Sequence, residues 1–116
     1  MKTPTKQSPK ARKTAALERL PNVHPGKILR TEVLEARGIS PTLLAEATGL
    51  PVSRINDLVK ERRGITVDSA IRLARALGTS PQLWLGLQID YEMEEAMRAK
   101  GPEYTRIKAL PVDAAA

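Results

Sequence analysis

The chain has 116 residues, of which 41% are hydrophobic, and a formal net charge of +6. This length suits one domain with a modest core. One Trp, two Tyr and no Phe leave the core to Leu, Ile, Val and Ala, which at helical spacing predicts an all-helical bundle. The absence of cysteine excludes disulfides and cysteine zinc sites, and no apolar run approaches the ~20 residues that cross a membrane. We therefore expect a soluble, cytoplasmic protein.

The positive charge is concentrated in residues 1–22, which hold six basic residues and one acidic residue. The remaining 94 residues hold thirteen basic and twelve acidic residues. Ordering the first segment would bury little apolar surface, so we predict a flexible basic arm joined to a nearly neutral domain. The arm is either a solvating tail, which its composition favours, or a segment that follows DNA phosphates or folds on a protein partner.

The first predicted helix begins at Pro25, whose missing N–H would be unpaired there anyway, and ends at Arg37 before Gly38. His24 is the only histidine, so no second His or Cys completes a metal set. We expect it to form a local hydrogen bond and to have no catalytic role. The apolar side of this helix is Ile28, Leu29, Val33 and Ala36.

The stretch 41–60 has the pattern of two short helices that meet at a glycine corner, a helix-turn-helix. Ser40 is a good N-cap for the second helix, which begins at Pro41 and ends near Thr48. Gly49 supplies the positive φ that ends this helix, and the third helix runs from about Val52 to Lys60. The space between the two helices suits one small residue and four apolar ones, which are Ala45 and Leu44, Leu50, Ile55 and Leu58. The predicted apolar sides are Leu43, Leu44 and Ala47 on the second helix, and Val52, Ile55, Leu58 and Val59 on the third.

The opposite side of the third helix is polar and is followed by basic residues. Ser and Asn near its start suit base edges, and basic residues beyond its end suit phosphates. The alternative is an ordinary solvated helix face, but the adjacent corner favours DNA contact. The side comprises Ser53, Asn56, Asp57 and Lys60, flanked by Arg54 and followed by Arg62 and Arg63.

Two more helices complete the predicted bundle of five. Thr66 caps the fourth, which ends before Gly78 and turns Arg72 and Arg75 outward. Ser80 caps the fifth, predicted from Pro81 to Lys100, with Gly101 and Pro102 as a stop. The apolar residues of the fourth helix recur as Val67, Ala70, Ile71, Ala74 and Leu77.

The fifth helix is apolar on two sides, which predicts a surface for homodimerisation because a peripheral helix needs only one buried side. Alternatively, both sides are buried in the monomer, beneath the C-terminal tail. The tail is either a short strand or disordered. One stripe is Leu83, Leu87 and Tyr91 beside Trp84, and the other is Leu85, Ile89, Met93 and Met97. The predicted dimerisation residues are Trp84, Leu85, Gln88, Ile89 and Met93.

Three stretches, HPGKILRTEVLEARGIS, LAEATGLPVSRINDLVKERRGIT and DSAIRLARALGTSPQLWLGLQIDYEM, resemble the HigA-type antitoxins of the lambda-repressor-like (XRE, Cro/C1-type) helix-turn-helix group. The resemblance covers about Val23 to Met97. It implies a five-helix, dimeric DNA-binding domain that binds a palindrome in its own promoter and neutralises a HigB-type toxin that cleaves messenger RNA on the ribosome. The predicted DNA-binding residues are Thr42, Val52, Ser53, Arg54, Asn56, Asp57, Lys60, Arg62 and Arg63.

Departures from this family leave alternatives open. Pro41 stands where such repressors often have Gln, Pro51 replaces a Ser-type cap, and the basic arm lies outside the family core. The rivals are a stand-alone transcriptional regulator without a toxin and a protein-interaction module that has lost DNA binding. An enzyme is the class that the sequence favours least, because it lacks a His pair, a glycine-rich phosphate loop and an evident nucleophile with a base, and we expect no cofactor or metal. The predicted organisation is arm 1–22, domain 23–101 and tail 102–116.

Overall fold

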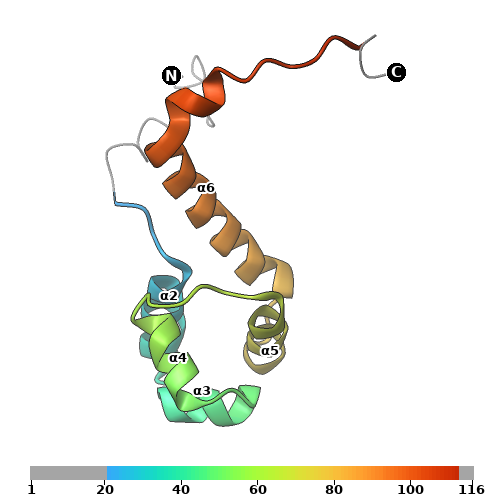
Figure 1. Ribbon diagram of the computed structural model, residues 1–116. Helices are drawn as coiled ribbons and strands as arrows, with labels where there is room; N and C mark the ends of the chain where they lie inside the picture. The colour runs from blue at the N-terminus through green and yellow to red at the C-terminus, as the bar shows by residue number, and fades with distance from the viewer. Residues whose placement is uncertain (1–20, 113–116) are drawn as a thin grey trace, which may run out of the picture.

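A computed structural model describes residues 21–112 of the chain. The helices are α2 (Pro25–Ile28), continued by a π-helical segment η2 (Leu29–Glu35), then α3 (Pro41–Thr48), α4 (Val52–Val59), α5 (Val67–Leu77) and α6 (Pro81–Thr105). Because α2 and η2 form one continuous helix, the described part is an all-α fold of five helices without strands, as predicted. Figure 1 shows α2 to α5 gathered in a cluster, with the long α6 leaving it at one end.

The first helix begins as its sequence predicts. His24 has an extended backbone, and its Nδ1 accepts the Gly26 N–H at 2.9 Å, so the imidazole acts as the N-cap. Pro25 occupies the first helical position. Gly38 ends the helix with a φ of +66°, a conformation that glycine adopts without steric penalty. The expectation that His24 forms a local hydrogen bond is confirmed.

The core is aliphatic apart from one tryptophan. Helices α3, α4 and α5 each contribute at least one side chain that is almost completely buried, and Trp84 enters from α6 with 1% exposure. Burial of these side chains supplies the main stabilisation of so small a domain. The most buried large side chains are Leu29, Leu44, Ile55, Leu58, Leu73 and Trp84.

Several residues predicted to be apolar contacts of the core are instead exposed. Each short helix touches its neighbours over a narrow arc, which on α3 includes Leu44, Ala45 and Thr48. Apolar residues outside this arc point to the surface. The predictions for Ala36, Leu43, Ala47, Val52, Val67 and Ile71 are therefore wrong.

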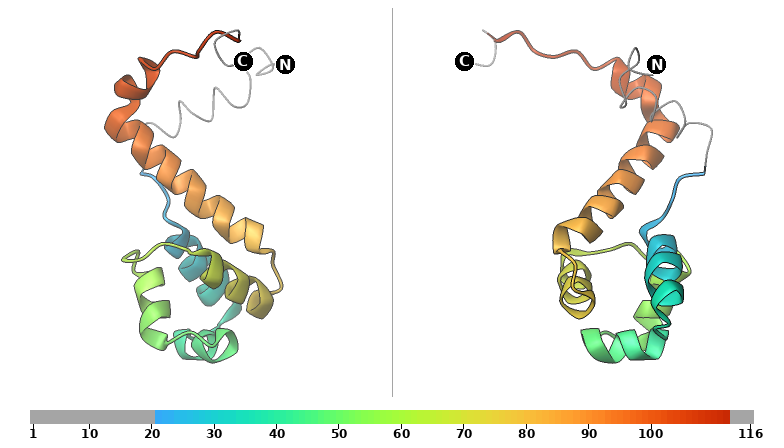
Figure 2. Two further views of the ribbon diagram at one scale, coloured as in Figure 1. Left: turned by 45° about the vertical axis from the view of Figure 1, so that its right-hand side comes forward. Right: turned by 180° about the vertical axis from the view of Figure 1, so that it is seen from behind.

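The last helix is 25 residues long and extends well beyond the cluster, as both views of Figure 2 show. Lys100 has non-helical φ and ψ values, so the regular helix is interrupted by a kink next to the predicted stop at Gly101 and Pro102. A single helical turn continues to Thr105. Residues 107–111 are exposed and irregular, which differs from the short-strand alternative for the tail. The basic segment 1–20 and residues 113–116 lie outside the described residues.

No helix within residues 21–112 is both long enough and apolar enough to cross a membrane.

Candidate nucleic-acid interface

The corner between α3 and α4 is built by local hydrogen bonds. Gly49 adopts a φ of +76°, and its N–H donates to Ala45 O at 2.9 Å. The Thr48 hydroxyl donates to Leu44 O at 2.8 Å and accepts the Leu50 N–H at 3.3 Å. Leu50 is buried behind the turn. The chain thus changes direction between α3 and α4 while the Gly49 and Leu50 amides and the Thr48 hydroxyl are all hydrogen-bonded.

The start of α4 lacks a side-chain cap. Pro51 occupies the N-cap position with an extended backbone and forms no capping hydrogen bond. Ser or Thr at this position would accept an N–H of the first turn. The N-terminal end of α4 is therefore held by its connection to the corner and by the burial of Ile55 and Leu58.

The end of α4 turns the following basic residues away from the helix axis. Glu61 has a φ of +62°, the only positive value for a non-glycine residue within residues 21–112. Its N–H donates to Leu58 O at 3.0 Å, and the Arg62 N–H donates to Asp57 O at 2.8 Å. These two bonds form a Schellman motif with glutamate where glycine is usual. Arg62 and Arg63 consequently lie in an exposed turn and not in a continuation of α4.

The nine residues predicted to contact DNA are all accessible at least in part. Thr42 is exposed on the first turn of α3, and the others lie on α4 or in the turn after it. Within residues 21–112, none of their side chains forms a hydrogen bond or an ion pair, so their polar groups are available to a ligand. The exposed ones are Thr42, Val52, Ser53, Lys60, Arg62 and Arg63, and the half-buried ones are Arg54, Asn56 and Asp57.

Residues outside the predicted set hold α4 in place. Arg30 Nη1 donates to Val59 O, in the last turn of α4, at 2.6 Å. A Cβ atom at Gly26 would overlap the carbonyl oxygen of Leu58, so this position must be glycine for α2 to approach α4 so closely. The sequence marks neither contact, because both depend on where α2 lies relative to α4.

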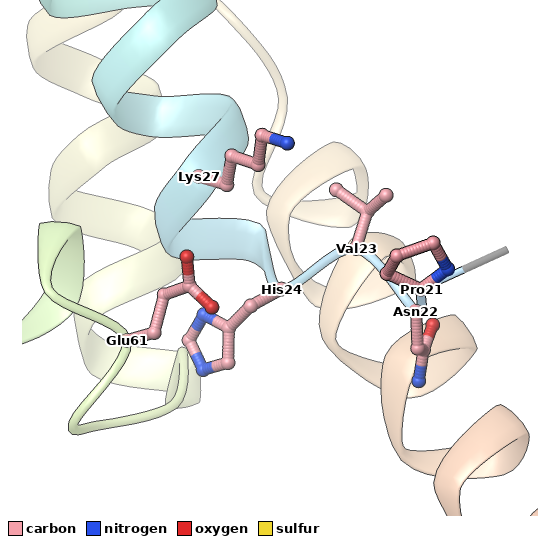
Figure 3. A pocket seen from close by; sticks show the side chains of 6 residues that line it. All are labelled: Pro21, Asn22, Val23, His24, Lys27 and Glu61. Atoms are coloured by element: carbon pink, nitrogen blue, oxygen red, sulfur yellow. The ribbon is translucent and has the colours of Figure 1, made fainter.

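A pocket beside the start of α2, which we call the His24 junction, is shown in Figure 3. It is lined by Pro21, Asn22, Val23, His24, Lys27 and Glu61. Burial lowers the pKa of His24, and the nearby Glu61 carboxylate opposes this effect. The His24 ring contacts the Tyr91 ring edge to face, with 4.8 Å between centroids. Asn22 Nδ2 donates to Tyr91 O at 2.8 Å. The junction therefore connects the start of the first helix to α6. Within the described residues, no group of three His, Cys, Asp or Glu side chains is placed to hold a metal ion.

Two of the five predicted dimerisation residues are buried within the protomer, which corrects their assignment. Trp84 Nε1 donates to Thr79 Oγ1 at 2.9 Å within the core. Gln88 Oε1 accepts the Ile65 N–H at 2.7 Å, which ties α6 to the segment between α4 and α5. Leu85 is half-buried against the core, whereas Ile89 and Met93 are 57% and 61% exposed.

The chain is similar in sequence and fold to known helix-turn-helix proteins. A family model described as a helix-turn-helix, HTH_3, matches residues 31–84. Antitoxin HigA-1 of Vibrio cholerae is 39% identical over 85 residues, which are 73% of this chain and 80% of that protein. The chain belongs to the HigA-type antitoxins of the XRE helix-turn-helix family.

The chain is also similar to two further proteins, one of which carries the HigA name. Virulence-associated protein I of Dichelobacter nodosus is 44% identical over 86 residues, 74% of this chain and 80% of that protein. The Pseudomonas aeruginosa antitoxin HigA, solved with the higBA promoter, has a TM-score of 0.71 and 41% identity over 79% of this chain and 99% of its own. HigA-type proteins are antitoxins and transcription regulators and not enzymes.

Proposed function

We propose that this HigA-type protein binds operator DNA through α4 and represses its own operon. The observation that carries the proposal is the set of unpaired polar and basic side chains on α4 and in the turn that follows it. A helix-turn-helix presents such a helix to the major groove. A similar HigA from P. aeruginosa has been solved with promoter DNA, which supports the same use of the fold here.

The side chains divide by their position along α4. Ser53 and Asn56 are short and lie in the first half of the helix, where they approach base edges. Arg54 flanks them. Lys60, Arg62 and Arg63 follow at the far end and neutralise phosphates, which gives affinity that falls with salt.

We further propose that two protomers associate through the exposed stripe of α6 and read a palindrome. Ile89, Met93 and Met97 are each about half exposed or more, and they follow one another at four-residue spacing. A second copy would cover this stripe and place two α4 helices in successive major grooves, roughly 34 Å apart. Leu85 borders the stripe.

Toxin neutralisation is the remaining part of the proposal. It rests on membership of the HigA family, whose relative in V. cholerae carries the name antitoxin. We propose a HigB-type toxin that cleaves messenger RNA, encoded beside this gene. Co-expression tests this: the two products should co-purify and growth should recover. A neighbouring candidate that is neither bound nor neutralised would favour a stand-alone regulator.

A gel-shift series with the upstream region of the gene tests DNA binding. Asn56→Ala should lose about 1 to 3 kcal/mol of binding free energy, the usual value of a good base contact. Gln82→Ala, an exposed amide on α6, is the matched control and should bind as the wild type does. Equal affinity of Asn56→Ala and wild type would refute the assignment of this residue, and failure of the wild type would favour a protein-interaction module.

The dimer is tested by its mass in solution. Ile89→Glu with Met93→Glu places two carboxylates in the proposed interface and replaces no buried residue. We expect a folded monomer with weaker operator binding. A dimer that persists in this variant would place the interface elsewhere.

A further inference from the structure

Three arginines, two from the first helix and one from α5, close the carboxyl ends of three helices. The last carbonyl groups of a helix lack an amide donor of the helix itself, and a cation beside them also complements the helix dipole. Each guanidinium here supplies one N–H across the bundle. The pairs are Arg30 with Val59 O of α4 at 2.6 Å, Arg37 with Leu77 O of α5 at 3.2 Å, and Arg72 with Thr48 O of α3 at 2.9 Å.

The contact of Arg72 lies at the corner of the helix-turn-helix. Thr48 O is the final carbonyl of α3, where the chain turns at Gly49. Asp68, one turn earlier on α5, accepts a hydrogen bond from Arg72 Nε at 3.0 Å and so orients the guanidinium. A Cβ atom at Gly49 would lie 3.0 Å from Arg72 Nη1. Glycine at this position therefore serves both the turn and the approach of an arginine from α5.

The contact of Arg72 supports a corner at which Pro51 provides no side-chain cap for α4. The other local supports are the Thr48 hydroxyl and buried Leu50. A small rotation at the corner moves side chains along α4, whereas a base contact needs a donor and acceptor within about 3.2 Å. The angle of α4 to the body of the domain thus affects every base contact.

We propose that Arg72, oriented by Asp68, is a positioning residue for operator binding. It ties the corner to α5 and so sets the angle at which α4 meets DNA. This inference rests on the proposed DNA binding. Arg72 contributes to operator affinity by holding α4 at the right angle and not by contacting a phosphate.

The experiment measures operator affinity of the full chain as a function of salt. Arg72→Met should weaken binding about tenfold, in line with the loss of a charge-assisted hydrogen bond. The slope of log K against log salt should equal that of the wild type, because no phosphate contact is lost. Arg72→Lys, which keeps a donor in reach of Thr48 O, should recover part of the affinity, and Asp68→Asn should show a smaller loss than Arg72→Met.

Two matched controls distinguish the effect of losing the contact at the corner from the effects of losing a positive charge and of losing overall stability. Arg75→Met removes the same charge from the same helix, at a side chain without a hydrogen bond or ion pair among residues 21–112. Arg37→Met removes the same kind of cap from the end of α5, away from the corner. Both should bind within about twofold of the wild type after correction for any folded fraction lost.

Each contrary result has a definite meaning. A salt slope that falls by about 0.9 in Arg72→Met alone would identify a direct phosphate contact and overturn the proposal. Equal losses for Arg72→Met and Arg37→Met, or no loss in Arg72→Met, would also overturn it. If the wild type itself does not bind, the proposed DNA binding fails, whereas the results above leave it standing.

Discussion

Local sequence predicts the positions of side chains well at the corner between α3 and α4. It predicts them poorly on the long helix α6. At the corner, capping residues, a glycine and short spacings determine the turn within a dozen residues. On α6, apolar residues occur on several sides, and the pattern does not tell which side the domain covers. The structure buries Trp84 and Gln88 and exposes Ile89 and Met93. The spacing of apolar residues therefore predicts that a segment is helical better than it predicts which side of the helix packs on the domain core.

The strongest test of this contrast is truncation on the two sides of α6. Trp84→Ala should lower the free energy of unfolding by about 3 to 5 kcal/mol, because it leaves a cavity and removes the hydrogen bond to Thr79. Met93→Ala, on the exposed stripe, should change it by less than about 0.5 kcal/mol in the monomer. Urea unfolding of a monomeric background such as Ile89→Glu measures both. Similar losses for the two variants would show that the sides of α6 are not distinct.

The corner is tested by alanine at two glycines with nearly equal φ. Gly49 and Gly78 have φ values of +76° and +75°, so alanine at either should cost about 1 to 2 kcal/mol. Space around Gly78 is open, whereas a methyl at position 49 would lie 3.0 Å from Arg72 Nη1 and would crowd the guanidinium that donates to Thr48 O. Thermal unfolding should therefore show the larger loss for Gly49→Ala. Equal losses would mean that the Arg72 contact adds no stability.

The smallest expected effect concerns the His24 junction, which connects the start of α2 to α6 through Tyr91. Burial lowers the pKa of His24 in the folded protein, so the unfolded chain binds its proton more readily. The contribution to stability is complete above the ordinary value of 6.5 and is lost as pH falls through it toward the folded pKa. Stability measured between pH 8 and pH 5.5 should therefore decrease.

A variant that keeps the cap without titrating isolates this effect. Asn at position 24 can accept the Gly26 N–H, so His24→Asn should flatten the decrease in stability. Glu61→Gln removes the carboxylate that opposes the lowering of the His24 pKa. The stability of this variant should therefore decrease more between pH 8 and pH 5.5 than that of the wild type. An unchanged pH profile in His24→Asn would assign the decrease to other groups.

Much of the candidate interface was predictable from sequence because it is contiguous. Eight of the nine predicted side chains lie between Val52 and Arg63, and helical spacing alone turns Ser53 and Asn56 away from Ile55. The same spacing misplaced Leu43 and Val52, since it identifies the side of a helix but not the width of the arc that neighbours cover. The anchors Arg30 and Arg72 carry no local signal, because an exposed arginine on a helix has the same pattern whether or not it reaches a distant carbonyl.

The amino-acid sequence by itself determined the helices, the glycine corner, the polar side of α4 and the family, because caps, φ preferences and periodicity act over a few residues. The tertiary structure alone decided which face of α6 belongs to the core, how Gln88 pairs with Ile65, and which arginine closes the end of each helix. These contacts join residues 23 to 40 positions apart. Such pairing depends on the packing of whole helices, which no short stretch of sequence specifies.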